Sequence, residues 1–354
     1  MKTALLHYWI TNIRGGEKVL AQLAKIFPQA DIFTHAFIAK NAGKIFNGHR
    51  ICESLISKLP LGRRHPQAYL PLMPFATRHL KLDKYDLIIS SESGPIKGIK
   101  KRPGQKHYCY CHTPMRYVWD MSDDYYRSAG PLGKLGMKLF LDYLKKEDLK
   151  SADSVDHFIA NSKFVANRIK RIYNRDSTVI HPPVDIDFFS SVRRNENSSS
   201  EPYYLFAGAN VAYKRLDLAV AACKKMNRRL IVAGGGRVTD EKLRELYANA
   251  KALIFPGIED FGIVPVEAQA AGTPVIAFGE GGALETVVEN ETGLFSRNRR
   301  SIRFAPLSKN SKAAHGPNAL AEITRPTFLT LPSQTQFPPS SAERGMANRP
   351  AHRF

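Results

Sequence analysis

The chain has few cysteines, a shortage of acidic residues and no long apolar run. Only 4 of its 354 residues are cysteine, and none has the spacing of a zinc site. No stretch approaches the roughly 20 apolar residues that cross a bilayer, and no secretory signal opens the chain. Cys109 and Cys111 alternate along an expected strand. We therefore expect a cytoplasmic protein with reduced cysteines and no metal.

Acidic residues are outnumbered, with 32 Asp and Glu against 52 Lys and Arg, and the net charge is +20. The segment from Arg297 onward carries ten Lys and Arg against two Glu. A second basic cluster comprises Lys97, Lys100, Lys101, Arg102 and Lys106. No nucleic-acid-binding motif accompanies these residues, so we expect no nucleic-acid partner. A basic face that meets an anionic membrane or acceptor fits better, and a plainly solvated surface is the alternative.

The most informative stretch is residues 251–278, which predicts a strand, a loop, a helix, a turn and a second strand. Residues 252–255 are continuously apolar, as in a strand that is buried on both faces. Pro265 stands where the first turn of a helix favours proline, and Gly272 marks the end of that helix. Residues 275–278 form the next strand.

Two carboxylates flank the expected start of this helix. Glu259 lies in the preceding loop, and we place Glu267 in the first helical turn. The N–H groups at a helix N-terminus bind phosphate well, and in a parallel sheet ligands bind at the carboxyl ends of the strands. Carboxylates beside such a site suit the hydroxyl groups of a sugar. The alternative is that Glu267 only complements the helix dipole and that Glu259 is solvated.

Strand-like and helix-like segments alternate along the rest of the chain, which indicates an α/β protein. Strands are expected at residues 3–9, 31–34, 85–91, 107–111, 157–160, 203–207 and 230–233, and helices at residues 17–27, 133–150, 163–173 and 240–250. Residues 50–82 are interrupted by prolines and give no clear pattern, and we expect a helix and irregular structure there. The amphipathic helix at residues 133–150 either touches a membrane or packs on its own sheet. The serine-rich residues 190–201 indicate a domain boundary.

Three motifs resemble those of the group 1 retaining nucleotide-sugar glycosyltransferases, a family that includes many bacterial mannosyltransferases. The sequence Glu-Asp-Phe-Gly at 259–262 with Pro-Val-Glu-Ala at 265–268 resembles the family's paired-glutamate motif. His-Thr-Pro-Met-Arg-Tyr at 112–117 and the segment 208–217 also resemble the family. The resemblance implies the GT-B arrangement of two Rossmann-like domains that face a cleft. We expect an acceptor-side domain at 1–185, a shortened nucleotide-sugar domain at 186–296, and a disordered or non-native tail at 297–354.

The resemblance also implies roles for individual residues. Glu259 would bind the hydroxyls of the donor sugar, Glu267 the ribose, and His112 the transferred sugar. Lys214, with the backbone N–H groups of the segment 261–263, would face the donor diphosphate. Gly15 and Gly16, expected in a loop, would face the cleft. The implied donor-binding set is therefore Gly15, Gly16, Lys214, Arg215, Phe261, Gly262, Ile263 and Glu267, with His112 and Glu259 as the catalytic pair.

The sequence departs from the family pattern at three places. Ala209 stands where the family commonly has a diphosphate-binding arginine, a loss that Arg215 partly compensates in this interpretation. After residue 236 the chain is shorter by about one helix and one strand, and the tail lacks the closing helices. These departures favour the alternative of an inactive or gene-damaged relative. Asp185 and Asp187 lie in a proline-rich turn and are not assigned to a metal.

The implied reaction moves a sugar from a nucleoside-diphosphate donor to an acceptor hydroxyl, with retention at the anomeric carbon and without a cofactor. Mannose from GDP-mannose is favoured from overall likeness. The acceptor would be a saccharide or a lipid-linked sugar of bacterial polysaccharide or glycolipid synthesis, at the inner face of the membrane. A nucleotide-sugar epimerase of the same fold is a further alternative.

Overall fold

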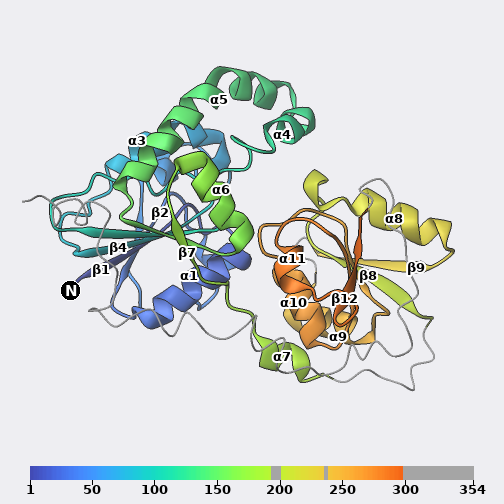
Figure 1. The fold of residues 1–354 in the computed structure, drawn as a ribbon. Helices are drawn as coiled ribbons and strands as arrows, with labels where there is room; N and C mark the ends of the chain where they lie inside the picture. Colours follow the sequence, from blue (N-terminus) through green and yellow to red (C-terminus); the bar gives the residue numbers. More distant parts are fainter. Residues whose placement is uncertain (193–200, 235–237, 298–354) are drawn as a thin grey trace, which may run out of the picture.

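The computed structural model describes residues 1–192, 201–234 and 238–297, which form two α/β units (Figure 1). One parallel sheet lies in each unit. The first has the strand order β3-β2-β1-β4-β5-β6-β7, and the second has the order β12-β11-β10-β8-β9. Two parallel sheets with helices confirm the fold class expected from the sequence.

The first sheet changes winding direction between β1 and β4, which are hydrogen-bonded neighbours. Ligands of open α/β sheets bind at such a point, beyond the carboxyl ends of the strands. The segments that follow β1 and β5 carry Gly15, Gly16 and His112. The strands of this sheet are β1 Thr3–His7, β2 Asp31–Thr34, β3 Ile51–Glu53, β4 Leu87–Glu92, β5 Lys106–Cys111, β6 His157–Ala160 and β7 Ser177–Val179.

Helices cover this sheet and bury apolar residues against it. The helix α1 packs Val19, Leu20 and Leu23 into a core that includes Leu5 and Ile32. The α-helices of this unit are α1 Gly15–Ile26, α2 Ala39–Ala42, α3 Met73–Arg78, α4 Ser122–Ser128, α5 Pro131–Ser151 and α6 Lys163–Tyr173. Its 3-10 helices are η1 Leu55–Lys58, η2 Pro66–Leu72 and η3 Ala152–Ser154.

The second unit is smaller. Its strands are β8 Tyr203–Ala207, β9 Arg229–Ala233, β10 Leu253–Phe255, β11 Val275–Phe278 and β12 Gly293–Ser296, and its helices are α7 Ile186–Ser190, η4 Ala212–Lys214, α8 Leu216–Lys225, α9 Asp240–Asn249, α10 Ile263–Ala270 and α11 Ala283–Thr286. Asp185 caps α7 by accepting the Phe188 N–H, and Phe189 packs into the second core. The chain has therefore joined the second unit by α7. The edge strand β9 is only partly covered, and the side chain of Val232 is half exposed.

Several local predictions were wrong or incomplete. The residues without a clear pattern contain β3, η1, η2 and α3, and both β7 and β12 were missed. The glycine pair does not lie in a loop, because Gly15 and Gly16 are the first two residues of α1. The serine-rich boundary falls largely on residues 193–200, and the tail on residues 298–354, so both predictions lie outside the described residues. Among the helices that the structure describes, none has the length and apolar character to span a membrane.

Candidate active site

The loop between β10 and α10 owes its shape to two glycines. Gly262 has φ +96° at the N-cap of α10, a conformation that favours glycine because it lacks a Cβ. Gly282 approaches the loop so closely that a Cβ would lie 2.3 Å from Phe261 Cα. Its N–H donates to the Glu259 carbonyl at 2.8 Å. The Gly281–Gly282 turn therefore supports the segment that carries the predicted donor residues.

Lys214 and Glu259 meet at the carboxyl edge of the second sheet. Lys214 ends η4, which follows β8, and its ammonium group lies 2.8 Å from Glu259 Oε1. Both side chains are largely buried. A Cβ on Gly208 would lie 3.0 Å from Lys214 Nζ, so the end of β8 adjoins this ion pair. The structure thus brings together a cation and a carboxylate that the sequence placed at the donor.

Glu267 lies one turn deeper in α10 than the sequence suggested. The helix begins at Ile263, so Glu267 is in the second turn and not the first. Its carboxylate is buried and accepts a hydrogen bond from the Tyr247 hydroxyl at 3.0 Å. Burial raises the pKa of Glu267 to about 7, although the charges of Lys18 and Lys214 oppose this shift. At neutral pH this carboxyl group is therefore partly protonated.

His112 follows β5 and faces the start of α1. Its Nε2 lies 2.8 Å from Ser91 Oγ, and the same hydroxyl lies 3.3 Å from His7 Nδ1. Burial, aided by the neighbouring His7, lowers the pKa of His112 to about 3. The imidazole is therefore neutral at physiological pH and can exchange hydrogen bonds, but it is not a general acid.

The glycine pair lies where the two units approach each other. A Cβ on Gly16 would be 3.5 Å from His112 Nε2, and a Cβ on Gly15 would be 3.1 Å from Ile263 Cδ1 of α10. Their position in α1 follows from capping, because Glu17 accepts the Arg14 N–H at 2.9 Å. The glycines thus allow the first turn of α1 to pack closely on both units.

Two further predicted residues are held by neighbours. The Arg215 guanidinium donates to the Asp217 carboxylate at 2.8–3.2 Å. Its compensation for the arginine missing at position 209 stays a prediction. Phe261 is buried and stacks on His181 of the first unit, with ring centroids 5.0 Å apart.

Charged contacts that were not predicted from the sequence link the two units. Asp260 receives hydrogen bonds from Arg116 and Arg168, and Glu285 of α11 accepts the N–H groups of Lys163 and Phe164. The only available signal was the presence of opposite charges in two motifs that both resemble one family.

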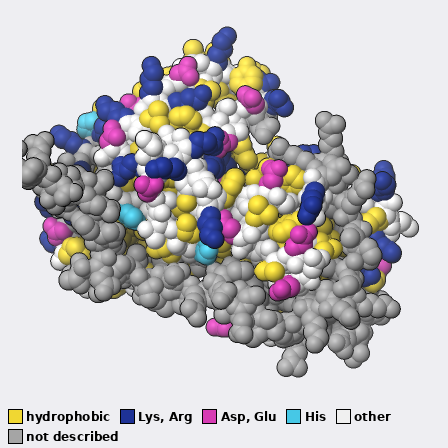
Figure 2. All heavy atoms as spheres, viewed as in Figure 1, with side chains coloured by type: hydrophobic (Ala, Val, Ile, Leu, Met, Phe, Trp, Pro, Cys, Tyr) yellow, Lys and Arg dark blue, Asp and Glu magenta, His cyan; other side chains and the backbone are white. Residues whose placement is uncertain are grey.

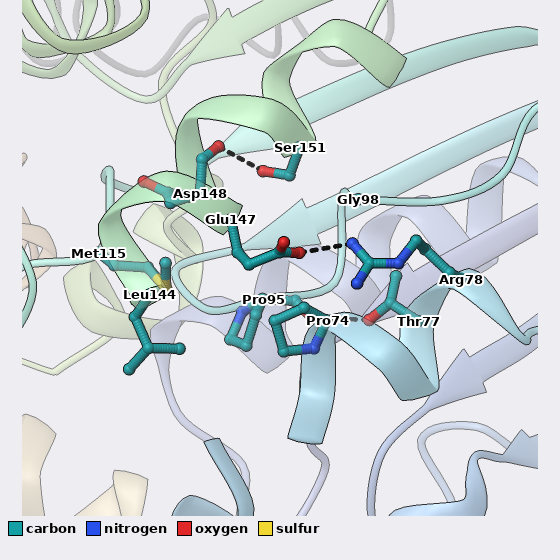
Figure 3. A pocket seen from close by; sticks show the side chains of 10 residues that line it. All are labelled: Pro74, Thr77, Arg78, Pro95, Gly98, Met115, Leu144, Glu147, Asp148 and Ser151. Carbon is teal, nitrogen blue, oxygen red and sulfur yellow. Dashed lines mark hydrogen bonds and ion pairs between the residues drawn. The ribbon is translucent and has the colours of Figure 1, made fainter. Parts of the chain in front are cut away.

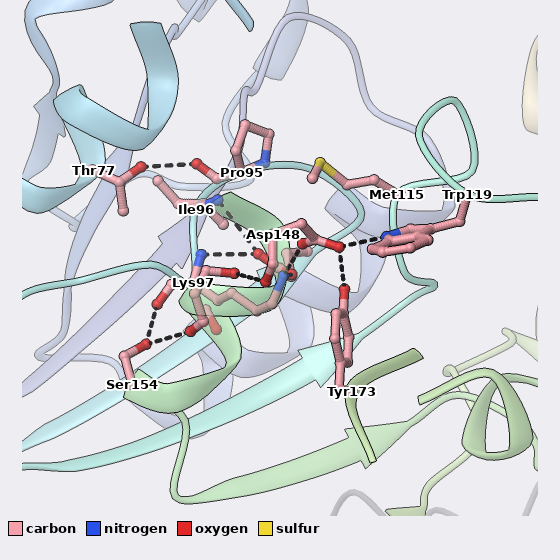
Figure 4. Close-up of polar contacts among 12 residues, drawn as sticks. Thr77, Pro95, Ile96, Lys97, Met115, Trp119, Asp148, Ser154 and Tyr173 are labelled. Atoms are coloured by element: carbon pink, nitrogen blue, oxygen red, sulfur yellow. Dashed lines mark hydrogen bonds and ion pairs between the residues drawn. The ribbon is translucent and has the colours of Figure 1, made fainter. Parts of the chain in front are cut away.

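The basic cluster near residue 100 is not a uniform surface. Lys97 is fully buried, and its ammonium group lies 2.8 Å from Glu92 Oε1 and 2.5 Å from Asp148 Oδ1 (Figure 4). Lys101 is paired with Asp156. The prediction of an exposed basic face was therefore wrong for Lys97, because two buried carboxylates require its charge.

The cavity lined by Pro74, Met115, Leu144 and Glu147 lies apart from the predicted donor residues (Figure 3). Its volume of about 10 Å³ is too small for a sugar. A wider groove of about 530 Å³ lies between η2 and α5, lined by Ala68, Tyr69, Pro71, Leu72, Leu139, Phe140 and Tyr143. Neither hollow contains a predicted donor residue.

Two family models match the chain, one on each unit. Residues 13–188 match Glycosyltransferase Family 4, and residues 235–307 match Glycosyl transferases group 1. The chain belongs to the group 1 glycosyltransferases. The resemblance that three short motifs carried is thereby confirmed for both halves of the protein.

Curated relatives within this glycosyltransferase family are distant. The D-inositol 3-phosphate glycosyltransferase of Mycobacteroides abscessus is 30% identical over 192 residues, which cover 43% of each chain. The alpha-1,3/1,6-mannosyltransferase ALG2 of Dictyostelium discoideum is 25% identical over 275 residues, which cover 59% of this chain and 63% of that protein. The matched region thus spans less than two thirds of either relative.

Solved structures show the same fold. Anabaena HepE in complex with UDP-glucose has a TM-score of 0.64 at 16% identity, covering 92% of this chain and 95% of that one. WaaG, a glycosyltransferase involved in lipopolysaccharide biosynthesis, has a TM-score of 0.57 at 16% identity, covering 93% and 95%.

Proposed function

We propose that this group 1 glycosyltransferase transfers a sugar from a nucleoside-diphosphate donor to an acceptor hydroxyl with retention at the anomeric carbon. The observation that carries the proposal is the meeting of Lys214, Glu259 and the N-terminus of α10 at one sheet edge. That edge faces the glycine pair of α1, since Ile263 approaches Gly15. A cation and free helix N–H groups suit a diphosphate, and the adjoining carboxylate suits sugar hydroxyls.

The residues act by position and charge. Lys214 and the backbone N–H groups of residues 261–263 would stabilise the negative charge that develops on the leaving diphosphate. Glu259 would orient the sugar hydroxyls, and Glu267 the ribose. His112 would hold the transferred sugar by a hydrogen bond from its neutral ring. The leaving phosphate itself would take the proton of the acceptor hydroxyl, so the reaction needs no cofactor.

Mannose from GDP-mannose is the favoured donor, supported by the name of the ALG2 relative. The HepE structure holds UDP-glucose, so UDP donors belong in the same test. The acceptor is a saccharide or a lipid-linked sugar of bacterial polysaccharide or glycolipid synthesis.

A thermal-shift titration of the full chain with GDP, UDP and ADP tests the donor site. A ligand at a concentration of about 100 times its Kd stabilises the folded protein by roughly 2.7 kcal/mol. A rise in Tm with one nucleotide, absent in Lys214→Ala, supports the proposal and names the base. A cooperative melt that no nucleotide shifts favours the inactive relative.

The reaction itself is tested with the matching nucleotide sugar and a panel of saccharide and lipid-linked acceptors. Release of the nucleoside diphosphate, with a product that keeps the donor's anomeric configuration by NMR, is the expected result. Conversion of the nucleotide sugar without any acceptor would instead identify an epimerase.

The protein works at the inner face of the membrane in this proposal, supported by the surface of α5. Leu132, Leu135 and Leu139 are exposed, and the side chains of Lys134 and Lys138 lie on the same helix. Over α5, apolar and basic side chains are interspersed on the surface, with a few acidic side chains among them (Figure 2). Exposed apolar residues beside lysines suit an anionic bilayer surface.

Vesicle flotation tests this surface. The wild-type chain should float with vesicles that contain anionic lipid and not with neutral ones. Leu135→Glu/Leu139→Glu should abolish flotation, whereas Val220→Glu, at an exposed apolar residue of α8, should not. Equal flotation of both variants would contradict the assignment to α5.

A further inference from the structure

Asp260 stands between two predicted donor residues, but its carboxylate binds the other unit. Arg116 Nε donates to Asp260 Oδ2 at 2.9 Å, and Arg168 donates to Asp260 Oδ1 at 2.9 Å. The three side chains are nearly buried, with exposed fractions of 11%, 7% and 11% for Arg116, Arg168 and Asp260. A carboxylate on the loop between β10 and α10, here called the donor loop, is therefore bound by two guanidinium groups of the first unit.

The backbone of the same residue is also bound across the interface. The Ser162 hydroxyl donates its single proton to the Asp260 carbonyl at 2.6 Å, and Asn161 Oδ1 lies 3.0 Å from the same hydroxyl. Asn161 in turn donates to the His112 carbonyl at 2.9 Å. A short series of polar contacts through Ser162 and Asn161 thus joins the loop of Glu259 to the backbone of His112.

The segment that supplies Arg116 is anchored on its other side. Trp119 Nε1 donates to the buried Asp148 at 2.7 Å (Figure 4), and Asp120 pairs with Arg168 at 2.5 Å. Asp260 therefore contacts a segment that is itself bound to the first unit by a hydrogen bond and an ion pair. A shift of the donor loop would break contacts instead of being absorbed by a mobile partner.

Among the described residues, one other ion pair joins the two units, and it differs in burial. Lys18 and Asp240 approach to 3.3 Å, but their side chains are 40% and 58% exposed. Exposed pairs contribute little, whereas removing one partner of a buried pair leaves an uncompensated charge. Of these ion pairs, those of Asp260 should therefore contribute most to the stability of the interface between the two units.

We propose that Asp260 is a positioning residue that fixes the loop of Glu259 against the segment of His112 and so holds the two units in register. It acts through Arg116 and Arg168 and does not itself touch the donor. The inference rests on the proposed transfer reaction for its kinetic consequence, and on the interface contacts alone for its structural one.

The test compares Asp260→Asn and Asp260→Ala with Asp240→Asn, which removes the exposed pair, as the matched control. Asp260→Asn keeps the shape of the side chain and guards against loss of folding. Small-angle X-ray scattering of the full chain should show a larger radius of gyration for both Asp260 variants than for the wild type. The control variant should have the same radius of gyration as the wild type. Displacement of a catalytic group by about 1 Å costs on the order of 10²-fold in rate, so kcat should fall by that order while the KM for the donor changes little. Asp260→Glu, which restores the charge, should recover part of the kcat.

The outcomes separate the two levels of the proposal. A wild-type chain without turnover counts against the proposed reaction, and the scattering comparison then decides the role of Asp260 alone. An unchanged radius of gyration in both Asp260 variants overturns the positioning role. So does a donor KM that rises as much as kcat falls, since that pattern would place Asp260 in the donor site itself.

Discussion

Lys214 Nζ lies 2.8 Å from Glu259 Oε1, so two residues predicted to hold different parts of one donor are bound to each other. Because the ammonium group is preorganised beside the end of β8, we expect it to contact the diphosphate. Lys214→Ala should raise the donor KM by roughly 10- to 100-fold, as loss of a charge-assisted contact of about 1.5–3 kcal/mol requires. Steady-state kinetics check this, with the exposed Lys225→Ala as control. Equal KM values for the two variants would contradict the role.

Position 209 offers a gain of function. Ala209 follows Gly208, which adjoins the Lys214 ammonium group, and it stands where the resembled family commonly has an arginine. Ala209→Arg should add a second cation and lower the nucleoside-diphosphate Kd by about tenfold, equivalent to roughly 1.4 kcal/mol. Isothermal titration calorimetry measures the change. The control is Asn210→Arg, which adds the same charge at the exposed neighbouring residue. An equal gain in affinity there would mean that the added charge attracts the nucleotide non-specifically.

Glu267 should show opposite effects on binding and on stability. Its pKa in the folded protein is about 7 against an ordinary value of 4.5, so the folded state binds the proton more tightly. The stabilisation from protonation is complete below the ordinary pKa and is lost as the pH rises through 7. Glu267→Gln should therefore gain in Tm relative to the wild type as the pH increases from 6 to 8. Melting curves at several pH values compare the two proteins directly.

Binding should move the other way. A ribose that donates hydrogen bonds to the ionised carboxylate binds better above pH 7. The Kd of the wild type for the nucleotide should therefore increase as the pH falls towards 6. Glu267→Gln should bind weakly and without this pH dependence. A wild-type Kd that stays constant from pH 6 to 8 would remove Glu267 from the ribose site.

Local pattern was sufficient where a segment is buried on all sides. The strand Asp31–Thr34 has the predicted bounds. The elements β10, α10 and β11 follow the predicted order, because proline or glycine bounds each of these apolar segments. The edge strand Ile51–Glu53 escaped notice because it is short and only half buried. Its pairing with β2 supplies a constraint that its own residues do not show.

The candidate site was predictable only one motif at a time. The sequence placed Lys214, Glu259 and His112 at the ends of strands, where parallel sheets gather such residues. It could not pair Asp260 with Arg116, because these residues lie 144 positions apart and the contact depends on how the two units meet. The same limit explains the error at Lys97, whose burial depends on Asp148, 51 positions away.

The buried cluster around Lys97 should be essential for stability. Its ammonium group pairs with both Glu92 and Asp148, and Asp148 also accepts hydrogen bonds from Trp119 and Tyr173. Burial disfavours the charge, but the two carboxylates outweigh it and hold the pKa of Lys97 well above its usual value. Lys97→Met leaves two carboxylates without their cation and should cost about 3–5 kcal/mol. Urea unfolding measures this, with the exposed Lys100→Met expected within about 0.5 kcal/mol of the wild type.

A compensated variant distinguishes the charge from the packing. Lys97→Met/Glu92→Gln/Asp148→Asn removes all three charges while keeping their approximate volumes. Because replacing a whole buried ion cluster is often close to neutral, this variant should recover most of the stability that Lys97→Met loses. The non-additivity of the three changes then reports the coupling between them. If the compensated variant is as unstable as Lys97→Met, the stem of Lys97 and its packing, not its charge, are what the first unit requires.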